Sequence, residues 1–323
     1  MNYNHHSKRG ETMIQALENS TKTVLSEQLV PDLLERYIRY IDASPKTIET
    51  YSKALRQFWQ YMQLHEITAP TRADILAYRE DLAASGHKPT TISGYITAIR
   101  LFFRWTAQEG LYHNIADHLK GAKIDRAHKK DYLNSAQVKE ILKNIDTRTL
   151  QGKRDYAILT TMITGGLRDI EIHRANIEDI RALGDSTVLM LQGKGHEEKT
   201  DYIKLSAPVE KAIRSYLKAR GSSAGADPLF ISLSNNSKGQ RITTRAISGI
   251  VKDRLRAAGY DSERLTAHSL RHTAITLSLI AGKDITEVQQ FARHSDISTT
   301  MIYNHALDKS KNSCNEAISA AIF

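Results

Sequence analysis

The chain has 323 residues, of which 41% are hydrophobic and 25% charged, the composition of a globular protein with room for about two domains. A single cysteine, Cys314, excludes a disulfide within the chain, and no apolar run is long enough to span a bilayer or form a signal-peptide core, so we expect a cytoplasmic protein with no membrane partner. The 45 Lys and Arg exceed the 36 Asp and Glu by nine, which favours a polyanionic partner such as nucleic acid.

The first part of the chain is expected to be helical. We predict a flexible N-terminal segment over residues 1–29 and a compact four-helix domain over residues 30–118. Apolar residues recur at helical spacing over residues 33–41, and Ser44-Pro45 ends that helix and opens the next, because proline is accepted in a first helical turn. Two further helices are predicted to begin after Thr71 and Lys88. We expect the core to contain Trp59, Phe102, Phe103 and Trp105.

A basic linker is predicted between the two domains, over residues 119–131. It contains five basic side chains and almost no apolar residue, so it cannot bury itself. Its charge favours a position along phosphate groups, with Lys129 and Lys130 as candidate DNA contacts. A solvated connector with no partner is the alternative.

The second domain is predicted to span residues 132–323. Ser135 is expected to cap its first helix, and a second, apolar helix over residues 155–164 ends at Gly165-Gly166. Residues 188–192 and 201–205 alternate as strands, and residues 193–200 join them, which predicts a β-hairpin. Helices follow over residues 246–258, 267–281, 285–291 and 299–306, with a last one near residues 315–322. The predicted fold class is therefore mainly α with a small β-sheet.

Two clusters could bind a phosphate group. Arg168 follows the glycine turn at the head of a helix, and Glu171 lies one turn later, where it can orient the guanidinium. A surface ion pair is the alternative interpretation. His268 and Arg271 are three residues apart on one helix face, so they place a proton-exchanging group beside an anion-binding group.

A zinc site is the other interpretation of the histidines, because His268 and His272 are four residues apart. However, Ser269 stands where a HExxH metalloprotease needs glutamate, and the chain has no cysteine-rich partner segment. We therefore expect no metal.

The third cluster holds Tyr303, nine residues after His294. Ser298 or Thr299 is expected to cap the short helix that carries the tyrosine on its second turn. A tyrosine normally packs in a core or on a surface. Its hydroxyl is a useful nucleophile only where a base takes its proton and cations stabilise the attacked group.

Four strings occur in the order TGGLRDIEI, QGKGHEEKTDYIKL, HSLRHT and ARHSDISTTMIYNHA. Together they resemble the catalytic domain of the tyrosine recombinases, the phage-integrase and Xer-like family. The helical segment before them resembles that family's core-binding domain. The resemblance covers residues 30–306, and it implies a helical, SAM-like core-binding domain followed by a mixed α/β catalytic domain with a C-terminal exchange helix.

The resemblance assigns the groups that would hold the phosphate. Arg168 and Arg271 match the two arginines that bind the non-bridging oxygens, and Glu171 takes the supporting acidic position. His294 matches the position that adds a hydrogen bond to the phosphate. Arg293 departs from the pattern, because glycine usually stands there, so it either alters the turn before His294 or adds a phosphate contact.

The resemblance also assigns the reacting groups. Tyr303 matches the nucleophile and His268 the acceptor of its proton. Lys194 falls on the hairpin lysine that protonates the departing 5′ oxygen, with Lys199 as the second candidate for that role. Met301 and Ile302, just before the tyrosine, vary from the family pattern without removing a reacting group.

The implied function is that of a site-specific DNA recombinase, either of the integrase and excisionase type or a resolvase. It would cleave and rejoin DNA through a 3′-phosphotyrosine intermediate, with no cofactor, metal or ATP. Two alternatives remain: a DNA-binding architectural or regulatory protein that keeps the fold without turnover, and a type IB topoisomerase that relaxes DNA as a single subunit.

The implied partner is double-stranded DNA carrying a specific, inverted-repeat site. We expect a monomer or weak oligomer without DNA and a homo-tetramer on two sites, in which the C-terminal helix docks on a neighbouring protomer or else folds back on its own domain. Accessory DNA-bending factors and a place at the bacterial nucleoid complete the expectation. Further candidate DNA contacts near helix starts or on polar faces are Lys46, Thr47, Lys88, Thr91, Arg100, Thr243, Thr244 and Arg245.

Overall fold

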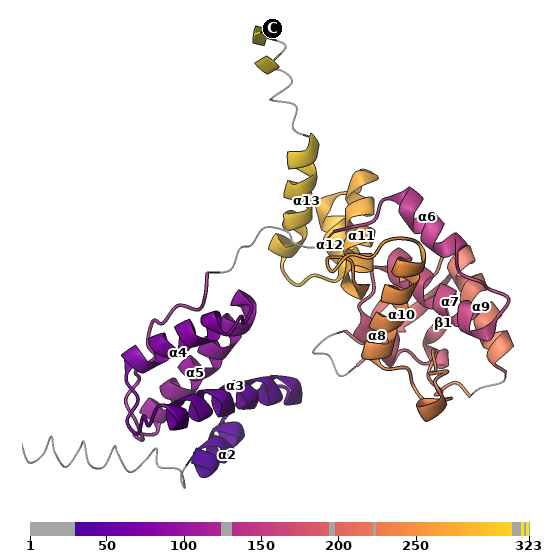
Figure 1. The fold of residues 1–323 in the computed structure, drawn as a ribbon. Coiled ribbons are helices and arrows are strands. Elements are labelled where there is room, and N and C mark those ends of the chain that lie inside the picture. Colours follow the sequence, from indigo (N-terminus) through magenta and orange to yellow (C-terminus); the bar gives the residue numbers. More distant parts are fainter. Residues whose placement is uncertain are drawn as a thin grey trace, which may run out of the picture. The chain divides into compact units, whose positions relative to one another are not determined.

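The computed structural model describes residues 30–123, 131–193, 198–221, 224–311, 318–319 and 321–322. The chain divides into two compact units between Arg126 and Ala127, and each has a hydrophobic core of its own. The described residues are mainly helical with one small three-stranded sheet (Figure 1), which confirms the predicted fold class.

The first unit is a bundle of four helices, as predicted. Ser44 caps the second helix, because its hydroxyl accepts a hydrogen bond from the backbone N–H of Thr47 at 3.3 Å. The Asp74 carboxylate accepts from the backbone N–H of Thr71 at 2.7 Å and thereby fixes the start of the third. The helices are α2 (Val30–Tyr40), α3 (Pro45–Leu64), α4 (Arg72–Ala84) and α5 (Pro89–Gln108).

Aromatic side chains fill the core of this unit. Phe102 lies at the centre, with its ring centroid 5.4 Å from that of Phe103, 5.6 Å from Trp59 and 5.7 Å from Trp105. All four side chains are buried. Edge-to-face and tilted pairs at these distances add to the stability gained by burial. The predicted packing role of these four residues is confirmed.

The first part of the predicted linker packs on the first unit. Leu119 is buried in its core, and the Ser93 hydroxyl of α5 donates to the carbonyl of Ala122 at 3.1 Å. Arg79 of α4 donates to the carbonyl of Lys120 at the same distance. Lys129 and Lys130 lie outside the described residues, and the domain boundaries stay predictions.

The second unit is built around one buried helix, α7 (Leu150–Gly165), which packs against α9, α10 and α11. Its other elements are α6 (Ser135–Lys143), α8 (Asp169–Arg174), η1 (Ile177–Asp179), β1 (Ile180–Leu183), β2 (Ser186–Leu191), β3 (Asp201–Lys204), α9 (Ala207–Arg220), η2 (Asn235–Ser237), α10 (Thr244–Ala257), α11 (Ala267–Ile280), α12 (Ile285–Ala292) and α13 (Ile297–Lys311).

The predicted hairpin is confirmed as part of a three-stranded antiparallel sheet of order β1-β2-β3. In its register Val188 lies opposite Lys204 and Leu191 opposite Asp201. The first strand, β1, was not predicted, because four residues are too few to show an apolar alternation. Three of them are exposed in the structure.

Several helix starts differ from the prediction, and α9 was not predicted. Asn134, not Ser135, caps α6, because its side-chain oxygen accepts from the backbone N–H of Gln137 at 2.9 Å. α7 begins at Leu150, behind the cap Thr149. α13 begins at Ile297, so Ser298 and Thr299 lie inside its first turn. Residues 318–319 and 321–322 are helical, and the rest of the predicted last helix lies outside the described residues.

Candidate active site

A glycine turn between α7 and α8 shapes one wall of the site. Gly166 ends α7 in the left-handed conformation, with φ 58° and ψ 36°. A Cβ there would lie 3.1 Å from two ring atoms of Phe291. The turn therefore needs glycine both for its backbone and for its neighbour. It exposes the Gly166 carbonyl to the site and brings Arg168 to the head of α8.

Arg168 is fixed by Glu171, as the sequence predicts. The carboxylate is completely buried and accepts twice from Arg168, from the guanidinium at 2.9 Å and from the backbone N–H at 2.8 Å. The side chain of Arg168 remains 26% exposed. Because one partner is wholly buried, this pair is not a surface ion pair. It holds a guanidinium at the rim of the site.

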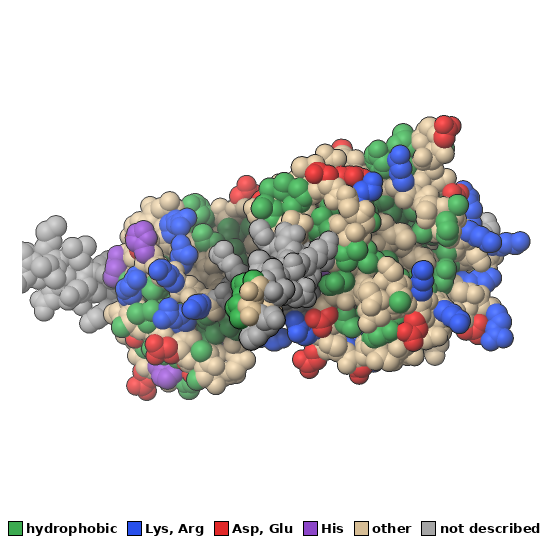
Figure 2. Space-filling view, turned by 90° about the horizontal axis from the view of Figure 1, so that it is seen from above, with side chains coloured by type: hydrophobic (Ala, Val, Ile, Leu, Met, Phe, Trp, Pro, Cys, Tyr) green, Lys and Arg blue, Asp and Glu red, His purple; other side chains and the backbone are tan. Residues whose placement is uncertain are grey.

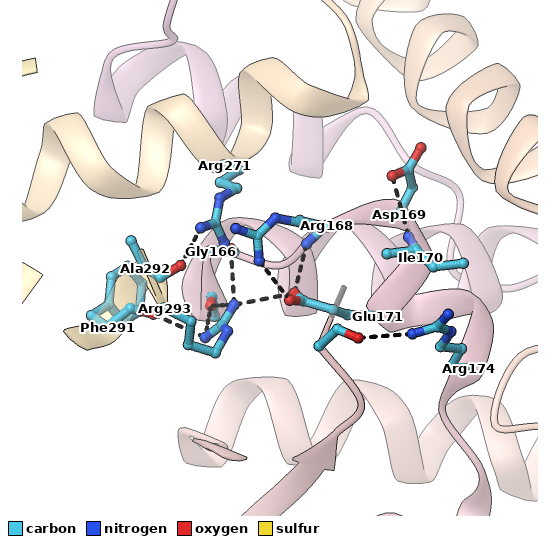
Figure 3. A network of polar contacts seen from close by, with 12 residues as sticks. Gly166, Arg168, Asp169, Ile170, Glu171, Arg174, Arg271, Phe291, Ala292 and Arg293 are labelled. Carbon is cyan, nitrogen blue, oxygen red and sulfur yellow. Dashed lines mark hydrogen bonds and ion pairs between the residues drawn. The ribbon is translucent and has the colours of Figure 1, made fainter. Parts of the chain in front are cut away.

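Arg271 comes from α11 and lies deeper, beside Arg168 (Figure 3). Its guanidinium donates to the carbonyl of Gly166 at 2.5 Å and to that of Ala292, the last residue of α12. Burial, together with the charges of Arg168 and Arg293, lowers the pKa of Arg271 to about 9. The guanidinium therefore stays protonated at neutral pH. Its hydrogen bonds join α11 to the turn after α7 and to the end of α12.

His294 follows α12, and its Nδ1 lies 2.9 Å from the hydroxyl of Thr300, which is buried in α13. Burial lowers the pKa of His294 to about 4, aided by the charges of Arg271 and Arg168. The imidazole is therefore neutral at pH 7. A neutral ring carries one N–H and can donate one hydrogen bond.

Tyr303 is buried on α13, in an apolar cluster with Ile275, Leu279, Val288 and Ala292. Its ring centroid lies 6.4 Å from that of His294, with the planes nearly parallel. Burial raises the pKa of Tyr303 to about 12, although Arg271 and Arg168 lower it. The phenol is therefore protonated at neutral pH and needs a base before it can attack.

His268 and His272 lie one turn apart on α11, with their ring centroids 4.5 Å apart and edge to face. The ring of His272 also lies 5.0 Å from that of Tyr303. The sequence pattern suggested His272 only as a metal ligand and did not reveal this contact, although the spacing of four residues places His272 on the same helix face as His268. Among the described residues no group of three or more His, Cys, Asp or Glu could hold a metal ion.

The two candidate lysines are in different situations. Lys194 lies outside the described residues. Its neighbour Gly193 accepts a hydrogen bond from Arg174 of α8 at 2.8 Å, so the start of the hairpin loop is tied to the helix that follows Arg168. The ammonium of Lys199 lies 2.5 Å from the buried carboxylate of Asp179. Lys199 is thus bound to a structural carboxylate.

Most of the candidate DNA contacts lie at helix starts. Lys46 and Thr47 lie in the first turn of α3, and Lys88 and Thr91 flank the start of α5. Arg100 is half-buried on α5. In the second unit, exposed Thr243 caps α10, and Thr244 and Arg245 form its first turn. Lys and Arg side chains are prominent on the surface drawn in Figure 2.

The site carries more positive than negative charge. Three guanidinium groups, those of Arg168, Arg271 and Arg293, meet there, and in the described part of the chain Glu171 is the carboxylate that pairs with Arg168 and Arg293. Surplus buried charge is unfavourable unless an anion completes it. The arrangement suits a bound phosphate group beside a tyrosine hydroxyl.

Met301 and Ile302, the two residues just before Tyr303, are exposed.

The sequence matches the phage integrase family over residues 131–310 and the N-terminal SAM-like domain of phage integrases over residues 32–112. A tyrosine recombinase of Synechocystis sp. is 30% identical over 286 residues, which cover 84% of this chain and 90% of that protein. The tyrosine recombinase XerD of Listeria monocytogenes is 29% identical over 288 residues, or 85% of this chain and 94% of that one. The solved structure of the XerH site-specific recombinase in a post-cleavage complex with palindromic difH substrate has the same fold, with a TM-score of 0.69 and 21% identity over 88% of this chain and 84% of that chain.

Proposed function

Because the chain belongs to the phage integrase family of tyrosine recombinases, we propose that it is a site-specific DNA recombinase in which Tyr303 is the nucleophile. One observation carries the assignment: the phenol of Tyr303 is buried beside guanidinium groups whose positive charge exceeds that of their carboxylate partner. A phosphodiester supplies the missing negative charge and the atom that the phenol attacks.

The reaction begins when the Tyr303 oxygen attacks the scissile phosphorus. Arg168 and Arg271 bind the non-bridging oxygens and stabilise the charge that grows on them. His294 donates a hydrogen bond to the same group, which its neutral state at pH 7 allows. The buried carboxylate of Glu171 holds Arg168 in place for this task.

Two proton transfers complete the step. His268 accepts the phenol proton as the bond from oxygen to phosphorus forms, and Lys194 protonates the 5′ oxygen as its bond to phosphorus breaks. The contact of His272 with the rings of both His268 and Tyr303 supports a place for His268 near the phenol. The product is a 3′-phosphotyrosine and a free 5′ hydroxyl.

Rejoining is the same reaction in reverse. A 5′ hydroxyl from the same or another strand attacks the phosphotyrosine and releases Tyr303. The covalent intermediate retains the energy of the phosphodiester, so rejoining consumes no ATP. Attack by a hydroxyl from another duplex gives strand exchange.

The proposed partner is double-stranded DNA with an inverted-repeat site, bound as a homo-tetramer on two sites with accessory DNA-bending factors. The net charge of +9 supports a DNA partner, as does the likeness to XerH, which was solved with its substrate. The basic and hydroxyl side chains at the starts of α3, α5 and α10 are candidates for contacts with the phosphates. In the described part of the chain, no helix is both long and apolar enough to cross a membrane. We place the protein in the cytoplasm, at the nucleoid.

The test is capture of the covalent intermediate. Wild-type protein is incubated with sparsely nicked genomic DNA fragments, adducts that survive SDS are isolated, and the attached ends are sequenced. We expect adducts at one sequence, linked through a 3′ phosphate. Tyr303→Phe should bind DNA normally but lower adduct formation by more than about 10⁴-fold, because the nucleophile is gone.

Tyr202→Phe is the matched control, because Tyr202 is an exposed tyrosine of the same unit. It should form adducts at the wild-type rate. Adducts formed by Tyr303→Phe, or none formed by the wild type, would contradict the proposal. Relaxation of supercoiled plasmid at any sequence would point instead to a topoisomerase.

A further inference from the structure

Arg293 has an unusual backbone for an arginine. It ends α12 in the left-handed conformation, with φ 51° and ψ 48°. A residue with a Cβ loses about 1–2 kcal/mol in this conformation, which glycine adopts freely. The contacts of its side chain offset part of that cost.

The side chain turns inward and is 9% exposed. Its guanidinium donates to the carbonyl of Phe291 at 2.9 Å and to that of Gly166 at 3.2 Å. It also donates to the Glu171 carboxylate at 3.2 Å (Figure 3). Arg293 thus joins the end of α12 to the turn between α7 and α8 and to the first turn of α8.

Two of the acceptors of Arg293 also hold the other two arginines. The carbonyl of Gly166 also accepts from Arg271 at 2.5 Å. The carboxylate of Glu171 also accepts from the side chain and backbone of Arg168. In Figure 3 the guanidinium of Arg293 is drawn at the Gly166 carbonyl that Arg271 also reaches. A movement of Arg293 would therefore displace acceptors that Arg168 and Arg271 also use.

We propose that Arg293 is a positioning residue for phosphoryl transfer, which holds Arg168 and Arg271 in the geometry of the transition state and adds positive charge beside His294. This inference rests on the proposed function of the pocket. Arg293 acts through Glu171 and Gly166 rather than by touching DNA. Its loss should therefore slow cleavage of bound DNA and leave DNA affinity unchanged.

The charge of Arg293 supplies a second, independent readout. Burial is the main reason for the low pKa of His294, and the charges of Arg271, Arg168, Arg293 and His268 follow. The Tyr303 ring also faces His294, but its protonated phenol carries no charge at neutral pH. Removal of one positive charge should raise the pKa of His294, which NMR titration of its imidazole measures directly.

The experiment compares three substitutions at one position. Arg293→Gln removes the charge, Arg293→Lys keeps the charge but not the planar set of donors, and Arg293→Gly relieves the backbone and so keeps the variant folded. Arg220→Gln is the control. Arg220 is the last residue of α9, and its side chain is also 9% exposed. Its guanidinium also donates to two backbone carbonyls, those of Pro228 and Leu229.

The measurements are the single-turnover rate of adduct formation at saturating DNA, the dissociation constant for DNA, and the pKa of His294 by NMR titration, with the signal assigned by His294→Gln. Arg293→Gln and Arg293→Gly should lower the rate by about 10-fold or more, because small displacements of reacting groups are costly. Both should also raise the pKa of His294. Arg293→Lys should lower the rate without this rise. Arg220→Gln should change thermal stability but neither the rate nor the pKa of His294.

Wild-type rates in both Arg293→Gln and Arg293→Gly would overturn the inference. So would a wild-type rate with weaker DNA binding, because Arg293 would then be a DNA contact. A slower rate with an unchanged pKa of His294 in both variants would reduce Arg293 to a structural group and overturn it as well. Failure of the wild type to form any adduct would overturn the proposed function instead, so the two failures are distinguishable.

Discussion

At the scale of single residues, Tyr303 and His294 respond to burial in opposite directions. Burial raises the pKa of the phenol to about 12 and lowers that of the imidazole to about 4, because each group is held in its neutral form. The charge of the pocket therefore resides on the arginines. The phenol proton has to leave during the attack rather than before it.

The low pKa of His294 predicts how stability depends on pH. The folded state binds this proton only near pH 4, whereas the unfolded chain binds it near 6.5. Between these values the unfolded state carries more protons, so the free energy of unfolding falls as pH falls from 6.5 to 4. His294→Gln should reduce this dependence, as measured by urea unfolding followed by far-UV circular dichroism at several pH values.

An identical fall in stability for His294→Gln and the wild type would show that the imidazole of His294 titrates normally in the folded state.

Sequence motifs identified most of this pocket in advance but not all of it. The resemblance pointed to Arg168, Arg271, His294 and Tyr303, and the structure brings these four together. It gave Arg293 two possible effects, on the turn and on a phosphate. The contact with Glu171 could not be predicted, because the direction of that side chain depends on the left-handed backbone and on a carboxylate 122 positions earlier in the chain.

At the scale of secondary-structure elements, the turn after α7 contributes both to stability and to the geometry of the pocket, and both contributions can be tested. Gly166→Ala adds a Cβ at φ 58° and within 3.1 Å of the Phe291 ring. We expect a loss of about 1–2 kcal/mol from the backbone alone. We also expect slower adduct formation, because the Gly166 carbonyl that holds Arg271 and Arg293 would move.

Gly184→Ala separates these two effects. Gly184 has nearly the same conformation, φ 55°, but an added Cβ would meet open space. It should lose comparable stability in thermal unfolding and keep the wild-type rate of adduct formation. Equal rates for the two variants would contradict a role of the Gly166 turn in the pocket.

Most elements with strong local signals were predicted, although α9 was missed despite a proline in its first turn, and elements fixed by tertiary contacts were not predicted. Ser44-Pro45 and Thr71 mark helix starts through their own chemistry, so α3 and α4 could be read from the sequence. The first turn of α7 contains Gly152, which weakens a helical pattern. Its place is explained only by the fold, because a Cβ there would lie 1.9 Å from the carbonyl oxygen of Asp146.

At the scale of the whole molecule, the two separate cores can be followed independently. The chain has two tryptophans, Trp59 and Trp105, and both are buried in the core of the first unit. Tryptophan fluorescence therefore reports the unfolding of the first unit, whereas far-UV circular dichroism reports the helices of both.

Phe103→Ala should destabilise the first unit by about 3–5 kcal/mol, because it empties a buried aromatic site. In a denaturant titration the fluorescence transition should move to lower denaturant, while a later dichroism transition from the second unit stays in place. Ile158→Ala, in the core of the second unit, is the converse control. A single transition that moves as one for both variants would contradict independent cores.

The order of the pocket residues along the chain has a consequence for protein synthesis. Arg168, Glu171 and Arg271 leave the ribosome before α12, and Tyr303 follows on α13. A polypeptide that stops before α13 therefore carries the arginines of the pocket without Tyr303. Under the proposed function, such a polypeptide can bind a phosphate group but is unable to break a strand.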